Sequence, residues 1–209
     1  MNHTELINYI IHKKGYKTYL EIGTEFGWNY DAIDIESKEC CDPDNSGYHE
    51  ITYNMPSDEM FTKININKTF DIIFIDGMHD EEYVDRDIIN SLKHLNPGGI
   101  ICVHDTIVKN AISQVTYENA NREWNGNTWK SITKLQDNNL EFYTILNNDW
   151  GLTIIKYKEN PYSLTIPIYN SKIRYNYIFN NTDDFNTCLT PQGKFVMHVI
   201  SEDQLDSIL

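Results

Sequence analysis

Hydrophobic and polar positions alternate along the chain in two rhythms, one typical of buried strands and the other of amphipathic helices. The clearest strand is Phe70–Ile75, which is almost entirely apolar, as expected for a parallel strand buried on both faces. The clearest helix covers residues 81–95, whose apolar positions fall on one stripe. The same patterns predict strands over residues 18–22, 38–42, 50–53 and 100–103, and helices over residues 5–13, 30–35, 57–64 and 107–115. Thr4 and Ser57 are the expected N-caps of two helices.

The order of these elements predicts the fold class. Strands that alternate with helices at this spacing are typical of a doubly wound, Rossmann-like α/β sheet that is mostly parallel. Two late strands, over residues 141–146 and 152–157, are joined by NNDWG, a connection short enough for an antiparallel hairpin. Later residues show little periodicity. We therefore expect one domain over residues 1–160 and an extension over residues 161–209 that packs on it.

Length and composition are those of a single soluble domain. With 209 residues and a hydrophobic fraction of 40%, the chain can bury a core without disulfides or a structural metal. Its cysteines form no C-x-x-C pair and lack histidines at zinc-finger spacing, so we expect reduced structural thiols. The segment MNHTELINYIIHKK lacks the apolar run of a signal peptide, and no later run reaches membrane-spanning length. We expect a protein of the cytoplasm, of a cell or an infected host, that does not bind membranes.

The net charge excludes one class of partner. A formal charge of -14 and a pI near 4.8 repel polyanions, and Lys and Arg form no basic stripe with interleaved aromatic residues. Nucleic acid is therefore not an expected partner. The acidic balance keeps the surface solvated, and it weakly favours a cationic ligand. A homo-oligomer is compatible with the sequence, which leaves the oligomeric state open.

The first candidate site is the turn EIGTEFG, which runs from Glu21 to Gly27 between a predicted strand and a helix. Glycine is needed where a ligand approaches the backbone, because a side chain would occupy that volume. A dinucleotide site would need G-x-G-x-x-G, so that a pyrophosphate can lie on the helix N-terminus. Here three residues separate Gly23 from Gly27, and the carboxylates of Glu21 and Glu25 disfavour phosphate and favour an ammonium or sulfonium. Taken alone, the segment is equally well explained as an ordinary turn.

An acidic turn follows the second predicted strand. The segment CCDPD begins about twenty residues after the first glycine, where a carboxylate can accept hydrogen bonds from the hydroxyls of a ribose. We favour Asp42 over Asp44 for this role. On its own, the segment DPDNSG is more simply explained as a turn.

Acids and histidines follow two further strands. Asp76 and His79 come after the strand at residues 70–75, and His104 and Asp105 come after the next one. Open α/β sheets bind ligands outside the carboxyl ends of their strands, so we expect these four side chains to face one cleft. Each could separately be a capping or structural residue. Their coincidence at two strand ends favours a site.

These motifs resemble those of the class I S-adenosylmethionine-dependent methyltransferases. The motifs concerned are YLEIG, FDIIFIDGMH followed by Tyr83 and Asp87, NPGG, HDT at residues 104–106, NTWK and DWG. The resemblance runs from about Tyr19 to Ile155, and within the class it is similar to the macrolide-sugar O-methyltransferases. The valine usual before the acidic turn is replaced by Cys41, and residues 33–39 are atypical.

The resemblance implies a seven-strand sheet whose last strand is antiparallel, and S-adenosyl-L-methionine as the cofactor. Glu21 and Gly23 would line its methionine end, Asp42 would bind the ribose, and Ser57 and Asp58 would lie near the adenine. The full set of implied cofactor-binding residues is Glu21, Gly23, Thr24, Gly27, Asp42, Ser57, Asp58 and Asp76.

The resemblance also implies a metal site. In the sugar enzymes an acid at the Asp76 position and acids at both positions 104 and 105 hold Mg²⁺, while the histidine of DGxH acts as base. The implied metal ligands here are Asp76, His104 and Asp105, and the implied catalytic residues are His79 and Asp76. Imidazole suits Mn²⁺, Fe²⁺ or Zn²⁺ better than Mg²⁺, so the resemblance leaves open which divalent metal, Mg²⁺ or Mn²⁺, is used, and whether one is used.

The implied reaction is methyl transfer to a hydroxyl of a small molecule, with a sugar or glycan as the favoured acceptor. His79 would take the hydroxyl proton, with assistance from the metal where one is bound. The segment Trp124–Lys130 is a candidate wall of the acceptor pocket, although its tryptophans are equally well explained as packing residues. Three alternatives remain, which are an N- or carboxyl-methyltransferase of a small metabolite, a catalytically silent cofactor-binding protein, and a nucleotide-binding α/β protein of another kind.

Overall fold

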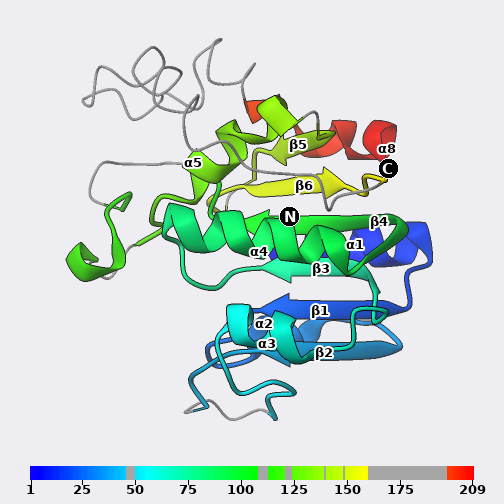
Figure 1. Cartoon of the computed structure of the whole chain (residues 1–209). Coiled ribbons are helices and arrows are strands. Elements are labelled where there is room, and N and C mark those ends of the chain that lie inside the picture. Colours follow the sequence, from blue (N-terminus) through cyan, green and yellow to red (C-terminus); the bar gives the residue numbers. More distant parts are fainter. Residues whose placement is uncertain (46–49, 108–112, 121–123, 139, 148, 160–196) are drawn as a thin grey trace.

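The computed structural model describes residues 1–45, 50–107, 113–120, 124–138, 140–147, 149–159 and 197–209. They form a seven-stranded sheet, in the order β2-β1-β3-β4-β6-β5-β7, with helices on both faces (Figure 1). The strands are β1 (Thr18–Ile22), β2 (Ser37–Cys41), β3 (Phe70–Ile75), β4 (Leu95–His104), β5 (Phe142–Ile145), β6 (Leu152–Lys156) and β7 (Val199–Ile200). The helices are α1 (His3–Lys14), α2 (Trp28–Ala32), α3 (Ser57–Lys63), α4 (Glu81–Lys93), α5 (Thr128–Thr133) and α8 (Leu205–Ile208).

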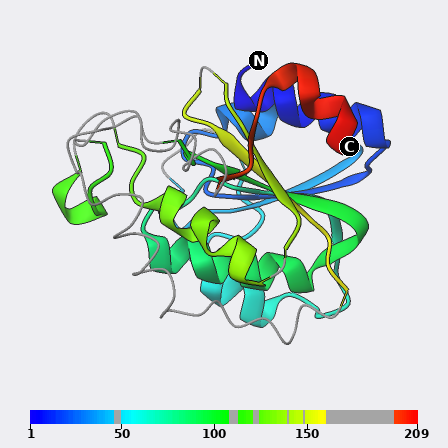
Figure 2. The ribbon, with the colours of Figure 1, turned by 90° about the horizontal axis from the view of Figure 1, so that it is seen from above.

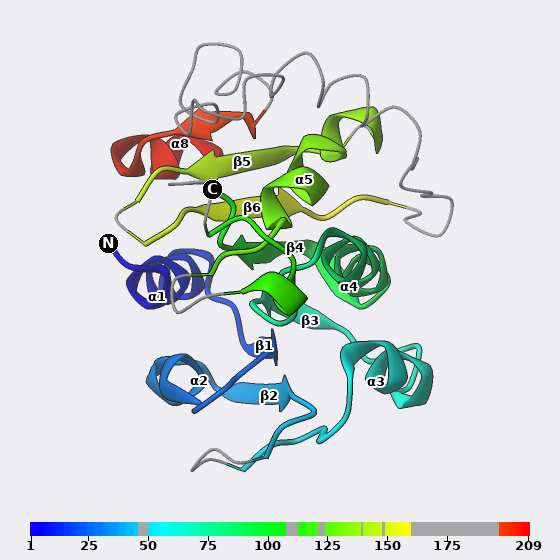
Figure 3. The ribbon, with the colours of Figure 1, turned by 90° about the vertical axis from the view of Figure 1, so that its left-hand side faces the viewer.

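Strand directions confirm the predicted class. Neighbouring strands from β2 to β4 pair in parallel, whereas β6 is antiparallel to both β4 and β5. The carboxyl ends of β1, β2, β3 and β4 therefore lie at one edge of the sheet, which faces the viewer in Figure 3. The sheet is doubly wound and mostly parallel, with the late antiparallel hairpin that the sequence predicts.

Each face of the sheet carries its own hydrophobic core. On one face α1 and α8 lie side by side (Figure 2), and Leu6, Ile10 and Leu205 pack with Phe74 of β3. On the other face α3, α4 and α5 pack through residues that include Met60, Ile88, Trp129 and Ile132. Burying apolar residues on both faces of parallel strands explains why β3 is almost entirely hydrophobic.

The seventh strand differs from the sequence expectation. It is β7, which pairs in parallel with β5 at the sheet edge, Val199 opposite Thr144. Two residues are too short to show a period, so no pattern predicted this strand. Residues 197–209 pack on the same sheet through Met197 and Leu205. The rest of the predicted extension, up to residue 196, lies outside the described residues, and the domain boundary at 160 stays a prediction.

Both predicted N-caps are wrong by one or two residues. Asn2, not Thr4, caps α1, because its side chain accepts from the Glu5 amide (2.9 Å) and the Glu5 carboxylate accepts from the Asn2 amide (3.0 Å). Thr4 instead donates its hydroxyl to Asn29, which ties α1 to α2. At α3 the cap position is taken by Pro56, and Ser57 is the first helical residue.

Four predicted elements differ in extent. The strand expected over 100–103 is β4, which begins at Leu95, a residue that was expected to be helical. Residues 50–53 form no strand, only a bridge between Tyr53 and Cys41. The helix expected over 30–35 is α2, which begins and ends earlier. Residues 108–112 of the helix expected over 107–115 lie outside the described residues, and residues 113–115 form a turn. Among the described helices none is long and apolar enough to cross a membrane.

Candidate active site

The glycine turn after β1 is packed against the end of β3. Gly23 has a φ of +83°, and a Cβ built on it would lie 2.4 Å from the carbonyl oxygen of Asp76. The Asp76 amide also donates to the Ile22 carbonyl (2.8 Å). Glycine is therefore required at this position because the backbone at the end of β3 leaves no room for a side chain. The sequence interpretation, that a ligand approaches the backbone of Gly23, did not anticipate this contact.

Asp42, at the end of β2, holds the same turn. Its Oδ2 accepts from the amides of Thr24 (2.8 Å) and Glu25 (3.0 Å), and its Oδ1 accepts from the Asp44 amide (2.9 Å). Gly27, with a φ of +79°, is the N-cap of α2, and its amide donates to the Thr24 carbonyl. The predicted ribose ligand thus lies directly beside the glycine turn, and its carboxylate is already engaged by backbone amides.

Glu21 is a buried acid under the turn. Its side chain accepts hydrogen bonds from the Tyr19 hydroxyl and from Asn29 Nδ2 (2.8 Å), and the residue is only 1% exposed. Burial raises the pKa of Glu21 to about 8, although both hydrogen bonds act against that rise. A cation arriving next to this group would favour its ionised form.

The predicted adenine contacts face α4. Asp58 accepts from Arg86 Nε (2.9 Å), and Ser57 hydrogen-bonds the buried side chain of Asp87. Burial raises the pKa of Asp87 to about 7. These pairs hold α3 on α4, so Ser57 and Asp58 have structural partners in addition to the proposed ligand.

The four polar residues predicted at two strand ends converge. Asp76 Oδ1 lies 3.3 Å from His79 Nε2 and 3.1 Å from His104 Nδ1. Asp105 Oδ2 lies 3.1 Å from His79 Nδ1, and Asp105 Oδ1 lies 3.5 Å from His104 Nδ1. Asp105 has a φ of 56°, a conformation that costs a non-glycine residue about 1–2 kcal/mol and that is concentrated at functional sites. Two imidazoles and two carboxylates thus form one cluster at the carboxyl edge of β3 and β4.

Charges in the cluster reinforce one another. Burial would raise the pKa of Asp76, but the charges and hydrogen bonds of His104 and His79 hold it below its ordinary value. Burial would lower the pKa of His79, but Asp76 and Asp105 raise it above its ordinary value, and the carboxylates raise the pKa of His104 further. Burial raises the pKa of Asp105. The negative carboxylates and the positive imidazoles therefore stabilise one another's charged forms in this partly buried site.

Two residues outside the predicted set complete this cluster. Asp149, in the β5–β6 hairpin, accepts at its carbonyl from His104 Nε2 (2.9 Å) and at its side chain from the amide of His3 (3.0 Å). His3 Nδ1 lies 2.5 Å from the same Asp149 oxygen, and His104 and His3 lower the pKa of Asp149. The DWG motif was a signal for Asp149. No sequence pattern pointed to His3.

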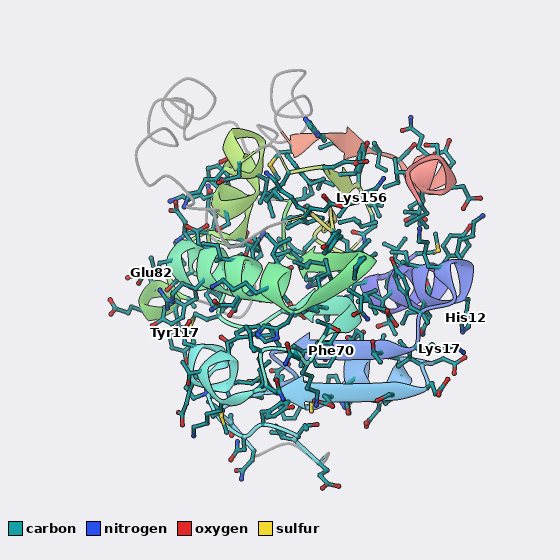
Figure 4. The ribbon with its side chains drawn as sticks, turned by 45° about the vertical axis from the view of Figure 1, so that its right-hand side comes forward. His12, Lys17, Phe70, Glu82, Tyr117 and Lys156 are labelled. Carbon is teal, nitrogen blue, oxygen red and sulfur yellow. The ribbon has the colours of Figure 1, made fainter. Side chains whose placement is uncertain are left out.

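Aromatic residues cover His79. The indole of Trp124 stacks on its ring, with centroids 4.9 Å apart and an interplanar angle of 20°. Trp124 Nε1 donates to the Val115 carbonyl (2.7 Å), and Tyr117 meets the indole edge-on at 5.5 Å. A Cβ on Gly126 would lie 2.3 Å from the His79 carbonyl oxygen, so this segment also packs tightly on the DGxH turn. Tyr117 lies at the outer end of the molecule, near the start of α4 (Figure 4).

The donor set is compatible with a divalent metal. Asp76, His79 and Asp105 can each offer one atom within 4.8 Å of the others, and so can His3, His104 and Asp149. Within the part of the chain that the structure describes, His79 Nδ1 is buried without a hydrogen bond. The predicted trio is also compatible, because His104 Nδ1 lies 3.1 and 3.5 Å from carboxylate oxygens of Asp76 and Asp105. Neighbouring ligands on an octahedral ion are separated by about 3 Å.

The structure has a doubly wound sheet with an antiparallel hairpin, a glycine turn after β1 and acids at the next strand ends. This is the arrangement that the resemblance to class I S-adenosylmethionine-dependent methyltransferases predicts. Residues 20–106 match the sequence model of a family described as "Methyltransferase domain". This segment carries every residue predicted to bind the cofactor, to hold a metal or to act in catalysis. No curated protein matches the chain.

Solved structures share the fold at low sequence identity. An O-methyltransferase from Bacillus cereus in complex with SAH superposes with a TM-score of 0.55 at 14% identity, covering 74% of this chain and 80% of that one. TomG from Streptomyces achromogenes, an O-methyltransferase in complex with SAM, gives 0.54 at 14% identity, with coverages of 74% and 79%. The N-methyltransferase NodS from Bradyrhizobium japonicum WM9 gives 0.51 at 15%, with coverages of 75% and 94%. Because both O- and N-methyltransferases are among them, the fold alone does not identify the acceptor atom.

Proposed function

We propose that this protein is an S-adenosylmethionine-dependent O-methyltransferase that acts on a hydroxyl of a small molecule, with a sugar or glycan as the favoured acceptor. The observation that carries this proposal is the convergence of Asp76, His79 and Asp105 beside the Gly23 turn. Methyl transfer to a hydroxyl needs a site for a cationic cofactor and a base beside it. The acidic turn and the histidine between two carboxylates provide these at the same edge of the sheet.

The cofactor would lie along the carboxyl edge. Glu21 under the turn would offer its carboxylate to the ammonium group of the cofactor, and the turn residues Gly23, Thr24 and Gly27 would lie beside the methionine end. Asp42 stabilises the turn, with two amides on Oδ2 and one on Oδ1, and keeps one acceptor site on Oδ1 for a ribose hydroxyl. Ser57 and Asp58 would face the adenine from α3, and Asp76 would lie near the methionine end.

His79 is the proposed base. In the transfer, the acceptor oxygen forms a bond to the methyl carbon while the carbon–sulfur bond of the sulfonium breaks. The hydroxyl proton passes to Nδ1 of His79, the ring nitrogen that has no hydrogen bond among the described residues, and the products are a methyl ether and S-adenosylhomocysteine. Asp76 orients the imidazole through its hydrogen bond with Nε2 (3.3 Å), and the carboxylate of Asp105, 3.1 Å from Nδ1, stabilises the imidazolium that forms.

A metal would be held by Asp76, Asp105 and His104. When bound, such an ion would polarise the acceptor hydroxyl and lower its pKa. The protein supplies the remaining functions, which are the alignment of the acceptor against the cofactor and the exclusion of water by Trp124 above His79.

Cofactor binding is the decisive test. Titration calorimetry with S-adenosylmethionine and with S-adenosylhomocysteine should show binding of one molecule per chain, and no binding at millimolar concentration would contradict the proposal. Mass spectrometry of candidate sugars and glycans, incubated with protein, cofactor and a panel of divalent metals, should then reveal a product heavier by one methylene unit.

Two other activities remain open to the same experiments. A methyl group on an amine or a carboxylate would favour an N- or carboxyl-methyltransferase, and NodS has the same fold. Cofactor binding without any product would favour a silent cofactor-binding protein, although the cleft acids are all present. The cytoplasm remains the expected location.

A further inference from the structure

His3 lies directly against the proposed active site, although it belongs to α1. Its ring meets the His104 ring edge-on, with centroids 4.4 Å apart, and stacks on Phe74 at 5.7 Å. Both the amide and Nδ1 of His3 bind Asp149. The first turn of α1 therefore contacts His104 directly through its ring and indirectly through Asp149.

Asp149 is held from two sides. His3 binds its carboxylate, and its own amide donates to Asn147 Oδ1 (3.1 Å), which also accepts from the Gly151 amide (3.0 Å). The Asp149 carbonyl is consequently fixed in front of His104 Nε2, 2.9 Å away. A carbonyl oxygen can only accept, so Nε2 of His104 must carry a hydrogen.

With Nε2 protonated, the other nitrogen of His104 faces the acids. Nδ1 lies 3.1 Å from Asp76 Oδ1 and 3.5 Å from Asp105 Oδ1. A histidine that donates one N–H to a backbone carbonyl and turns its other nitrogen to carboxylates has the orientation of a metal ligand. An imidazole nitrogen in place of a carboxylate favours Mn²⁺ or Zn²⁺ over Mg²⁺.

We propose that the His3–Asp149 pair is a positioning unit for His104, which presents Nδ1 to Asp76 and Asp105 and makes this site selective for Mn²⁺ or Zn²⁺ over Mg²⁺. The role of the ion in catalysis rests on the proposed function, whereas binding of the ion does not. His3 acts only through Asp149 and His104, and touches neither the ion nor the substrates.

Metal titrations of the full chain, prepared without an N-terminal tag and stripped with a chelator, test the proposal. Calorimetry should show one Mn²⁺ or Zn²⁺ per chain, bound at least about tenfold more tightly than Mg²⁺. The substitution His104→Asp should remove this preference by restoring a third carboxylate. His3→Phe keeps the ring stacking and removes the nitrogens, and it should weaken Mn²⁺ binding by about tenfold.

A matched control is His12→Phe, on the same helix but far from the site (Figure 4), where His12 pairs with Asp34 at the surface. This variant should bind Mn²⁺ as the wild type does. Long-range nitrogen–proton NMR of the metal-loaded protein adds a readout that a purely structural role would not move. It should show His104 with hydrogen on Nε2 only, and His3→Phe should broaden or shift that signature.

Three results would overturn the proposal. They are no metal binding by the wild type, unchanged Mn²⁺ affinity in His3→Phe, and a hydrogen on both His104 nitrogens in protein titrated with Mn²⁺ or Zn²⁺, which would make the ring itself the cation of the site. Binding of S-adenosylhomocysteine is measured on every sample. If S-adenosylhomocysteine does not bind while the metal selectivity holds, the proposed function is wrong and this inference stands. If S-adenosylhomocysteine binds but no metal does, this inference is wrong and the proposed function stands.

Discussion

Gly23 and Asp76 lie at the ends of neighbouring strands, so close that a Cβ on Gly23 would fall 2.4 Å from the Asp76 carbonyl oxygen. This contact joins the two motifs of the site, because the glycine turn after β1 and the DGxH turn after β3 can be positioned only together. The backbone amide of Asp76 reinforces the junction by donating to Ile22.

The substitution Gly23→Ala should therefore cost more stability than the backbone conformation alone explains. We expect a loss of about 3 kcal/mol in the free energy of unfolding, measured by urea denaturation, because strain at positive φ adds to a backbone clash. Gly98→Ala is the matched control: Gly98 has a φ of +81° but no atom within 4 Å of an added Cβ. It should lose only about 1 kcal/mol. Equal losses in the two variants would show that the junction does not require glycine.

Glu21→Gln should change how stability depends on pH. Burial raises the pKa of folded Glu21 from 4.5 to about 8, so its contribution is fully present below pH 4.5 and is lost as pH rises through about 8. Glutamine mimics the neutral acid and carries no such loss. In urea denaturation, the free energy of unfolding of the variant should rise relative to that of the wild type by a few kcal/mol between pH 5 and pH 9. A difference that stays constant across this range would contradict the assignment.

The same acid predicts a proton-linked cofactor affinity. If Glu21 pairs with the ammonium of S-adenosylmethionine, binding at pH 7 must ionise it and release most of one proton, because its pKa is about 8 in the free protein. Calorimetry in phosphate and in Tris, whose ionisation enthalpies differ, measures this release directly. Glu21→Gln should bind the cofactor more weakly and without the buffer dependence. A wild type that releases no proton would place Glu21 away from the ammonium.

The sequence predicted β1 to β6 because each has a period or an apolar run, and it predicted the meeting of Asp76, His79, His104 and Asp105 because parallel strands end at one edge. It missed His3, since an amphipathic helix gives no sign of which strand end its first turn will meet. It missed β7 because pairing of two residues is decided by the tertiary fold. The sequence also did not predict the Gly23–Asp76 contact, because this contact depends on the register between β1 and β3.

Trp124→Ala should weaken binding of the acceptor and leave binding of the cofactor unchanged. The indole stacks on His79 and bounds the space above the proposed base, and ring stacking of this kind contributes about 0.5–1.5 kcal/mol. We expect the acceptor KM to rise by about two- to tenfold, with Trp124→Phe in between. Trp28→Ala is the matched control, since Trp28 is 76% exposed and its indole stacks on Phe26. An equal loss of S-adenosylhomocysteine affinity in Trp124→Ala would assign the indole to the cofactor.

His79→Gln tests the base. Glutamine keeps a polar group beside Asp76 but cannot accept a proton, so the turnover rate should fall by about 10²–10⁴-fold with cofactor affinity unchanged. A base acts when neutral, and Asp76 and Asp105 raise the pKa of His79 above 6.5. The wild-type rate should therefore increase with pH through a value above 6.5, and the variant should lack this increase. His12→Gln, on the surface at the far end of α1, should keep the wild-type rate and profile. If His79→Gln retains full turnover, the proton goes to another group, and Asp105, whose pKa is raised by burial and which lies 3.1 Å from His79, is the next candidate.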